Sequence, residues 1–376
     1  MNFLITGYYF DGFHGSMLHI AELAETLIAK DFNVYIASVE ITKEIKLYIE
    51  SIGAKLYFVE DLPLDIEYDY VLAYHEPILT YLLEKGLKYK HIGVGSLSAF
   101  EPREVPSLLV KYNIPLFVHS EKLSHYWNEQ LQIPKENIFI FPNSVPERFN
   151  RVEHKTKKLN SVAIVSNHIP EEIFESIELL KKQNITVDIY GKGYNYTLIT
   201  PEILNKYDVI ITIGKTVQYS LYMGIPVYCY DKWGGVGYIT LDNIKKEEFD
   251  NFAGRSGKKM SKDEIAKDVI SNYQNTISQM SEITGYIKEH FSLEKNIDNL
   301  IEHLNTTPNI PNTAEWKIYK THCYTSMLDI IRLKRIINSN KQLCYFVYNF
   351  LNKITFGKCF KNKAKIATEL NKYILK

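Results

Sequence analysis

The sequence has few of the features that mark disulfide frameworks, zinc sites and membrane spans. Its four cysteines form no CxxC pair and no zinc-binding spacing, so we expect free thiols in a reducing compartment. No run approaches the roughly 18 apolar residues that a membrane span needs. Residues 1–7 lack the basic start and the apolar core of a secretory signal. These absences predict a cytoplasmic protein, or one that touches a membrane only at its surface.

The most specific patterns for nucleotide and metal binding are absent as well. Neither the GxGxxG pattern nor the P-loop pattern occurs in the chain, and no DxD-like acidic pair stands at the end of a predicted strand. Basic residues gather in the C-terminal tail and not across a predicted folded face, so we do not expect nucleic-acid binding. We predict no resident cofactor and no metal site.

Length and charge distribution predict two folded domains and a basic tail. A chain of 376 residues is too long for one average core and suits two. The formal net charge is zero, but residues 331–376 hold eleven Lys or Arg and one acid, Glu369, so the tail is near +10 and the rest near −10. This tail also contains seven aromatic residues. It could lie on an anionic bilayer or dock on the acidic body of the protein, and both interpretations stay open.

Short apolar runs alternate with helix-length segments, which predicts an α/β chain with two Rossmann-like domains. We expect the first domain over residues 1–150 and the second over residues 151–305, joined by the polar segment 142–160. Residues 306–376 are predicted to be a helical, basic extension. The expected strands are 2–6, 33–38, 55–59, 70–74, 91–95, 116–119 and 138–141 in the first domain, and 162–166, 187–190, 209–213 and 227–230 in the second.

The most informative stretch runs from Asp208 to Tyr238. An apolar strand, a turn at Gly214–Thr216, a helix, the stop Gly224-Ile-Pro226 and a second strand make a compact βαβ unit. Parallel βαβ units gather their loops at the carboxyl ends of the strands, where open α/β sheets bind ligands. Because N–H groups at a helix N-terminus favour an anion, we predict that this turn and Asp231–Gly235 face a phosphate-bearing ligand.

This stretch resembles the donor-binding segment of GT-B glycosyltransferases, where a strand, a small-residue turn, a helix, a GxPV stop and a strand-end turn surround the nucleotide-sugar. Further matching pieces occur in order within the first 300 residues: the glycine-bearing loop 7–15, His75-Glu76-Pro77, His119-Ser120-Glu121 and Phe141-Pro-Asn143-Ser-Val145. The resemblance implies the GT-B fold, with two Rossmann-like domains facing a cleft. It places the donor on the second domain and the acceptor on the first, and it implies transfer without a metal ion.

The chain departs from the resembling family at two places. Many retaining members carry two glutamates eight positions apart in the central stretch, but this chain has no glutamate from residue 208 to residue 238. The family's Arg and Lys near the start of the second domain are not evident where this chain reads Val165-Ser-Asn-His168. Two other functions therefore stay open: a GT-B-like epimerase acting on a nucleotide-sugar, and a catalytically silent module that binds a glycan or a partner transferase.

Polar residues that follow predicted strands of the first domain are the catalytic candidates. His75 and Glu76 come directly after the strand 70–74, at the edge where catalytic groups of α/β folds collect. His75 could hold a sugar hydroxyl or simply cap a loop. Glu101 follows the next strand, so Glu76 and Glu101 could divide the roles of base and orienting group, although Glu101 also fits a solvated loop acid. A structural role stays open for His14, which we place on the acceptor side with Gly12, Gly15 and Ser120.

The donor-binding candidates follow strands of the second domain. Asn167 and His168 stand where a predicted strand end meets a helix N-terminus, a suitable place for a phosphate or a ribose. The turn at Gly191 corresponds to one that lies near the donor base in the resembling family, although an ordinary hairpin-like turn fits too. Arg255 could fork onto a phosphate. The full set is Asn167, His168, Gly191, Lys192, Gly214, Lys215, Thr216, Asp231, Gly234, Gly235 and Arg255.

Together these features predict a glycosyltransferase that moves a sugar from a nucleotide-sugar to a hydroxyl of a surface glycan or glycolipid. Lys215 and the backbone N–H groups of Gly214–Thr216 would stabilise the departing phosphate, where negative charge develops. The expected partners are the nucleotide-sugar, the glycan or glycolipid acceptor and, through residues 331–376, an anionic membrane surface on the inner face of the cell membrane.

Overall fold

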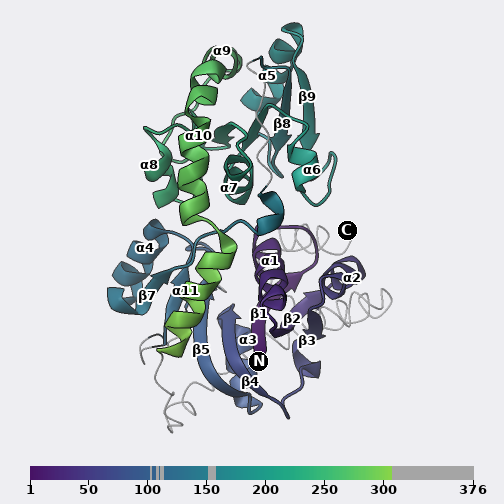
Figure 1. Ribbon diagram of the computed structural model, residues 1–376, viewed down its shortest axis with the longest axis vertical. Helices are drawn as coiled ribbons and strands as arrows, with labels where there is room; N and C mark the ends of the chain where they lie inside the picture. Colours follow the sequence, from purple (N-terminus) through teal and green to yellow (C-terminus); the bar gives the residue numbers. More distant parts are fainter. Residues whose placement is uncertain (102–103, 107–109, 111–113, 151–157, 307–376) are drawn as a thin grey trace, which may run out of the picture. The chain divides into compact units, whose positions relative to one another are not determined.

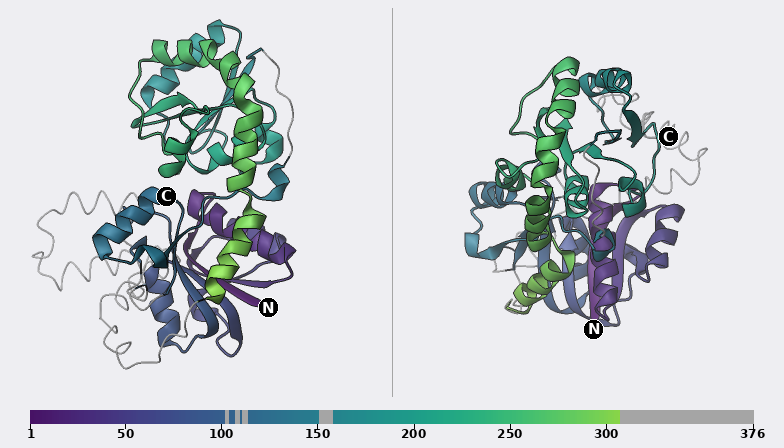
Figure 2. Two further views of the ribbon diagram at one scale, coloured as in Figure 1. Left: turned by 60° about the vertical axis from the view of Figure 1, so that its left-hand side comes forward. Right: turned by 45° about the horizontal axis from the view of Figure 1, so that its top comes forward.

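The computed structural model describes residues 1–101, 104–106, 110, 114–150 and 158–306, and of residues 76 and 77 it describes only the backbone. Residues 1–310 cluster as one compact unit. Within it the chain builds two largely parallel β-sheets with helices packed on them (Figure 1 and Figure 2). This confirms the predicted α/β architecture of two Rossmann-like sheets. The predicted basic extension, residues 306–376, lies outside the described residues except for Thr306.

The first sheet contains seven parallel strands in the order β3-β2-β1-β4-β5-β6-β7. All seven strands predicted for the first domain are present, and the central strands β1, β2 and β4 are buried along most of their length, as a parallel sheet requires. The strand order reverses direction between β1 and β4. The elements are β1 (Asn2–Phe10), α1 (Gly15–Ala29), β2 (Asn33–Ile41), α2 (Lys43–Ser51), β3 (Lys55–Phe58), β4 (Glu67–Tyr74), α3 (Glu76–Glu84), β5 (Lys88–Ser96), β6 (Leu116–Val118), α4 (Glu121–Leu131) and β7 (Ile138–Ile140).

The second sheet has the strand order β12-β11-β10-β8-β9. The four strands predicted for the second domain are confirmed, and β10 pairs in parallel with β11, as the βαβ interpretation of the central stretch requires. The elements are β8 (Ser161–Val165), α5 (Glu171–Lys182), β9 (Thr186–Tyr190), α6 (Pro201–Leu204), β10 (Val209–Thr212), α7 (Lys215–Tyr222), β11 (Val227–Asp231), β12 (Gly234–Tyr238), α8 (Ile244–Phe249) and α9 (Lys262–Ser271).

The antiparallel strand β12 was not predicted, because the sequence suggests only a turn from Asp231 to Gly235. Gly234 has a φ of 101°, and a Cβ added to it would lie 2.4 Å from the carbonyl carbon of Lys258. Gly235 exchanges two backbone hydrogen bonds with Lys258, at 3.1 and 3.2 Å. The two glycines therefore permit a tight hairpin that packs on a neighbouring segment, and the N–H group of Gly235 is already used there.

The helices at the end of the described chain also differ from the prediction. The pattern predicts one helix over 262–278 and another over 285–304, whereas the structure has α9, α10 (Tyr273–His290) and α11 (Leu293–Asn305). Ser292 separates the last two, because its side chain accepts a hydrogen bond from the N–H group of Lys295 and so caps α11. The break lets α10 pack on α7 while α11 packs on α1 and β5 of the first sheet (Figure 1).

The apolar face of α11 completes the core of the first sheet. Its four buried residues are at most 3% exposed and belong to one cluster with residues of β1 and α1. The chain thus returns to the first sheet after it has built the second. The predicted limits of the second domain, residues 151–305, include α11, whereas in the structure α11 packs on the first sheet. The four residues are Leu293, Ile297, Leu300 and Leu304.

Replacing Leu300 with alanine should lower the free energy of unfolding by about 2–5 kcal/mol, because the change removes buried methyl groups and leaves a cavity. Urea unfolding followed by circular dichroism measures this loss. Ile270→Ala is the matched control, since Ile270 is 38% exposed, and we expect a change of about 0.5 kcal/mol or less. Equal losses in the two variants would contradict the placement of α11 in the core.

Candidate functional site

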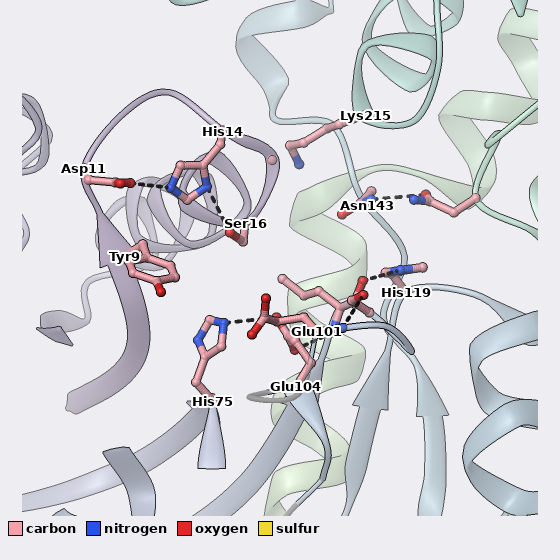
Figure 3. Close-up of a pocket in the computed structure, with 14 residues that line it drawn as sticks. Tyr9, Asp11, His14, Ser16, His75, Glu101, Glu104, His119, Asn143 and Lys215 are labelled. Atoms are coloured by element: carbon pink, nitrogen blue, oxygen red, sulfur yellow. Dashed lines mark hydrogen bonds and ion pairs between the residues drawn. The ribbon is translucent and has the colours of Figure 1, made fainter. Parts of the chain in front are cut away.

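A cavity of about 530 Å³ lies where strands of the first sheet end (Figure 3). Residues that follow β1, β4, β5 and β6 converge there, because these strands are parallel neighbours. The edge includes the reversal of strand order between β1 and β4, the position where open α/β sheets bind ligands. The lining consists of Tyr9, Asp11, His14, Gly15, Ser16, His75, Leu97, Ser98, Glu101, Glu104, His119 and Asn143, together with Lys215 and Asn251 from the elements of the second sheet.

His14, which the sequence analysis places on the acceptor side, lines the cavity and directly precedes α1. Its Nδ1 accepts a hydrogen bond from the N–H group of Met17 at 3.3 Å, so His14 caps the helix. A nitrogen that accepts from an N–H group carries no proton, so the neutral ring is protonated on Nε2. That Nε2 lies 3.1 Å from Oδ1 of Asp11. His14 therefore has a structural role as the cap of α1, and these contacts fix its ring at the cavity wall.

His75, at the end of β4, pairs with a residue that the sequence analysis did not identify. Its Nε2 lies 3.1 Å from Oε1 of Glu104, and both side chains are buried. The N–H group of Tyr8 donates to His75 Nδ1 at 3.1 Å, and the N–H group of Leu97 donates to Glu104 Oε2 at 2.8 Å. The pair is thus tied to the ends of three strands, β1, β4 and β5.

The other two predicted catalytic acids have different outcomes. Glu101 lines the cavity. The backbone of Glu76 begins α3, but its side chain lies outside the described residues. Glu104 was missed because the pattern around it predicts an ordinary helix, and a buried acid leaves no mark in the spacing of residues. A polar residue a few positions beyond a strand end is the only signal that could have pointed to it.

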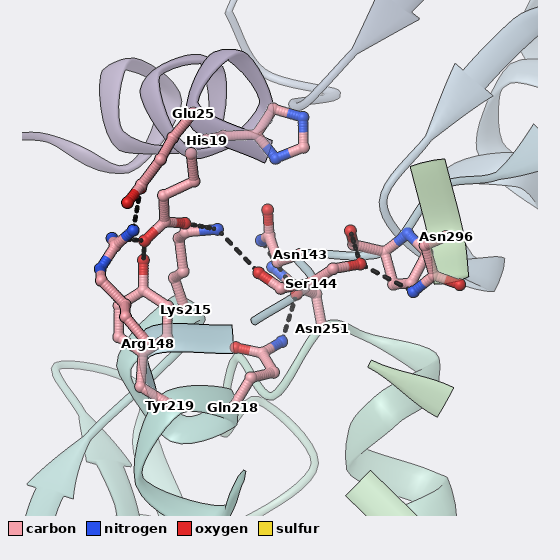
Figure 4. Close-up of polar contacts among 12 residues, drawn as sticks. His19, Glu25, Asn143, Ser144, Arg148, Lys215, Gln218, Tyr219, Asn251 and Asn296 are labelled. Atoms are coloured by element: carbon pink, nitrogen blue, oxygen red, sulfur yellow. Dashed lines mark hydrogen bonds and ion pairs between the residues drawn. The ribbon is translucent and has the colours of Figure 1, made fainter. Parts of the chain in front are cut away.

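A second buried carboxylate, Glu22 on α1, contacts three polar side chains. These three, Lys215, Arg148 and Tyr219, are labelled in Figure 4. Glu22 is 1% exposed, and its Oε2 lies 2.7 Å from Nζ of Lys215. Its Oε1 accepts hydrogen bonds from Nη2 of Arg148 at 2.7 Å and from the hydroxyl of Tyr219 at 2.5 Å. Arg148 pairs with Glu25 as well. Two cations thus compensate two carboxylates, and a buried network of this kind loses stability when one partner is removed.

The ammonium group predicted to face a phosphate is therefore already paired. Nζ of Lys215 also donates to the carbonyl oxygen of Ser144 at 3.2 Å, and the side chain is only 9% exposed. The helix α7 begins after Gly214, which has a φ of 62° and provides no side-chain cap. The N–H group of Gly214 donates to the carbonyl oxygen of Phe252 at 3.0 Å. The N–H groups of Lys215 and Thr216 thus remain the candidates for an anion at this helix end.

Several other donor-binding candidates lie at the carboxyl edge of the second sheet. Asn167 follows β8, Gly191 follows β9 and Asp231 ends β11, and the parallel pairing of β8, β9, β10 and β11 brings these positions to one edge. Oδ1 of Asn167 accepts a hydrogen bond from the N–H group of Lys192 at 3.0 Å, which joins two of the turns. Their part in donor binding stays a prediction.

The remaining predicted residues lie outside the lining of the described cavity. The guanidinium of Arg255 lies 5.5 Å from the ring centre of Phe100. Ser120 caps α4. A Cβ added to Gly12 would lie 2.9 Å from the hydroxyl of Tyr196, so this glycine permits a close approach. The others are His168, Thr216, Gly234 and Gly235.

Burial controls protonation beside the cavity. It lowers the pKa of His19 well below its ordinary value, and the positive charge of Lys215 adds to the effect. Burial also lowers the pKa of His119. Both rings are therefore neutral in neutral solution. Burial, followed by the charge of Glu22, raises the pKa of Tyr219 well above its ordinary value, so the phenol keeps its proton and donates it to that carboxylate.

Among the described residues, no three His, Cys, Asp or Glu side chains are grouped so that they could hold a metal ion. In the same part of the chain, none of the helices combines the length and the apolar character needed to cross a bilayer. The described cysteine, Cys229, is a buried free thiol, as predicted, and burial raises its pKa.

Glu22→Gln should lower the free energy of unfolding by about 3–5 kcal/mol, because it leaves the buried Lys215 without its counter-charge. Chemical denaturation monitored by tryptophan fluorescence would measure the loss. Glu25→Gln removes the same charge from a side chain that is 37% exposed and pairs with the same arginine, so its cost should be about 1 kcal/mol or less. A larger loss for Glu25→Gln would contradict the central position of Glu22.

Stability should fall as the pH is lowered from about 7 to about 5, because unfolded His19 takes up a proton near pH 6.5 whereas the folded ring, with its lowered pKa, does not. One such histidine contributes a slope of up to about 1.4 kcal/mol per pH unit in this range. His19→Gln keeps a hydrogen-bonding side chain that does not titrate, so its slope should be smaller. Urea midpoints at several pH values test this, and identical slopes would refute it.

Comparison with known proteins identifies the fold. No protein-family model matches the chain, and neither does any curated protein sequence. HepE from Anabaena, solved with UDP and glucose, matches over 81% of this chain and 99% of its own, with 11% identity and a TM-score of 0.57. A mutant of TarM from S. aureus, solved with UDP and sugar ligands, matches over 81% of this chain and 100% of its own, with 11% identity and a TM-score of 0.53.

A candidate UDP-N-acetylglucosamine 2-epimerase from Listeria monocytogenes matches over 83% of this chain and 99% of its own, with 12% identity and a TM-score of 0.50. At such low identities these matches bear on the fold and not on the activity. They cover four fifths of the chain. The chain therefore has the GT-B fold that the sequence predicts.

Proposed function

We propose that the protein transfers a glycosyl group from a nucleotide-sugar to a hydroxyl group of an acceptor. The observation that carries the proposal is the composition of the cavity: residues at the carboxyl edge of the first sheet line it together with Lys215, the first residue of α7. Open α/β sheets bind ligands at this edge, and a helix N-terminus favours an anion. A donor phosphate at α7 and an acceptor hydroxyl in the cavity would therefore meet.

On the donor side, the N–H groups of Lys215 and Thr216 would donate to the phosphate. The ammonium group of Lys215 would add positive charge while its contact with Glu22 holds α7 in place. Charge that develops on the departing phosphate is stabilised most when such donors are fixed in advance. Because these groups supply the positive charge, we propose that transfer requires no metal ion.

On the acceptor side, the cavity offers both donors and acceptors of hydrogen bonds, as a polyhydroxylated sugar requires. Tyr9, Ser16 and Asn143 contribute neutral groups, and Asp11 and Glu101 contribute carboxylates. We propose a surface glycan or glycolipid as the acceptor. The positive charge of residues 331–376 supports a cytoplasmic enzyme that works beside an anionic membrane, where a glycolipid would lie.

The match to a candidate epimerase favours one alternative, isomerisation of a nucleotide-sugar without a second substrate. The missing glutamates between residues 208 and 238 favour another, a module that binds without turnover. Incubation of the protein with nucleotide-sugars, with and without octyl glycosides as acceptors, separates the three. Nucleotide release that depends on the acceptor supports the transferase, isomerisation without acceptor supports the epimerase, and binding without either reaction supports the module.

Thermal unfolding with UDP, GDP, CMP, ADP and dTDP should identify the donor nucleotide. We test UDP first because HepE and TarM were solved with it. A nucleotide present at about 100 times its dissociation constant should add roughly 2.7 kcal/mol to the stability of the folded state. If none of the five shifts the melting temperature, the donor-site assignment of α7 fails.

Lys215→Ala should weaken binding of that nucleotide about tenfold or more, which corresponds to about 1.4 kcal/mol. Titration calorimetry separates this effect from the loss of stability that also follows when Glu22 loses its partner. Lys30→Ala is the matched control, because Lys30 also forms an ion pair, with Asp298 at 2.8 Å, but does not line the cavity. Equal affinities in the two variants would rule out a role for Lys215 in binding the donor.

A further inference from the structure

The residue that follows β4 has a strained backbone. His75 has a φ of 66° and a ψ of 95°, outside the conformations that residues other than glycine ordinarily adopt. Its side chain is 7% exposed and lines the cavity. Such strain persists only where the surroundings hold the residue firmly, and it concentrates at functional sites. The contacts that hold His75 therefore decide which of its ring nitrogens carries the proton.

The contacts of the ring fix the position of its proton. Nδ1 accepts a hydrogen bond from the backbone N–H group of Tyr8, and a backbone N–H group can only donate. Nδ1 therefore carries no proton, and the proton of the neutral ring lies on Nε2. Nε2 faces Oε1 of Glu104 at 3.1 Å, so the histidine donates to the carboxylate. Neither nitrogen can take a proton from a substrate unless one of these contacts breaks.

Glu104, unlike His75, can accept a proton from a substrate without breaking one of its contacts. Its two oxygens accept one hydrogen bond each, from His75 and from the N–H group of Leu97. A carboxylate has about four lone pairs, so acceptor capacity remains on both oxygens. The backbone is held as well, because the hydroxyl of Ser96 donates to the carbonyl oxygen of Glu104 at 2.8 Å. Glu104 is 4% exposed, yet it lines the cavity, so the cavity contains a carboxylate that is fixed in place.

Three carboxylates line the described cavity, and they differ in how they are held. The side chain of Asp11 is 50% exposed and pairs with His14. Glu101 is half-buried. Glu104 alone among the three is buried and held by donors from the ends of two strands, β4 and β5. A proton acceptor is most effective when its position is fixed before the substrate binds.

We infer that Glu104 is the group that takes the proton from the acceptor hydroxyl, with His75 as its positioning residue; this rests on the proposed glycosyl transfer. The acceptor oxygen forms a bond to the anomeric carbon while its proton passes to a carboxylate oxygen of Glu104. The bond from that carbon to the donor phosphate breaks, and the nucleotide leaves with the electron pair. Glu104 then returns the proton to water. A single displacement of this kind inverts the configuration at the anomeric carbon.

The test compares Glu104→Gln with Glu101→Gln, a change of the same charge in the same loop. Each protein is incubated with UDP-glucose, UDP-N-acetylglucosamine, GDP-mannose, ADP-glucose, dTDP-glucose and CMP-sialic acid, with octyl glycosides as acceptors. We expect Glu104→Gln to lower kcat about 100-fold or more, the range of general base catalysis, while the KM for the donor changes less than about threefold. Glu101→Gln should lower kcat far less. Proton NMR of the product should show inversion.

Three further variants keep the test decisive if Glu104→Gln folds poorly. Glu104→Ala should be inactive and should regain activity with added formate, which supplies a carboxylate to the vacated space. His75→Asn tolerates positive φ and keeps a donor N–H group, so it should retain more kcat than His75→Ala with the same donor KM.

Normal kcat in Glu104→Gln, or a product with retained configuration, would overturn the inference alone. A wild-type protein that turns over none of the donors would overturn the proposed function and the inference with it.

Discussion

The structure depends on one buried carboxylate, that of Glu22. It lies on α1, a helix that packs on the first sheet, and it binds Lys215 and Tyr219 of α7 and Arg148 of the segment between the sheets. Buried charges are tolerated only when their partners are in place. The position of α7, and with it the helix end that we assign to the donor phosphate, is therefore fixed by a residue far away in the sequence.

Much of the fold could be predicted because parallel strands leave a strong local signal. The apolar runs that became β1, β4 and β10 are buried along most of their length, and a polar residue or a glycine follows within two positions. That pattern also located part of the candidate site, since His75 directly follows β4, Glu101 lies in the segment after β5, and the ends of these strands share one edge. The polar segment between β7 and β8, expected as a linker, contains Arg148, whose contact with Glu22 no local pattern reveals.

The parts that could not be predicted depend on contacts between distant residues. β12 forms because Gly234 and Gly235 allow the hairpin to approach Lys258. The division between α10 and α11 depends on a serine cap and on an apolar face that finds its partners in the first sheet. Glu104 is a site residue only because His75 and the N–H group of Leu97 meet it. In each case the residue type was visible in the sequence, but its partner was not.

The charges of the cavity are arranged in a way that suits the proposed transfer. His75 and His119 are held neutral there, one by the direction of its hydrogen bonds and the other by burial. Among the described lining residues, the carboxylates of the first sheet's loops and the Nδ1 of His119, whose Nε2 donates to the carbonyl oxygen of Leu97, have capacity to take a proton, whereas Lys215 belongs to α7. A reaction that removes a proton from one substrate and creates negative charge on the other needs this separation of a base from a cation. Because Lys215 pairs with Glu22, its ammonium group stays with α7, at the helix end that we assign to the donor phosphate, and is not the counter-charge of Glu104.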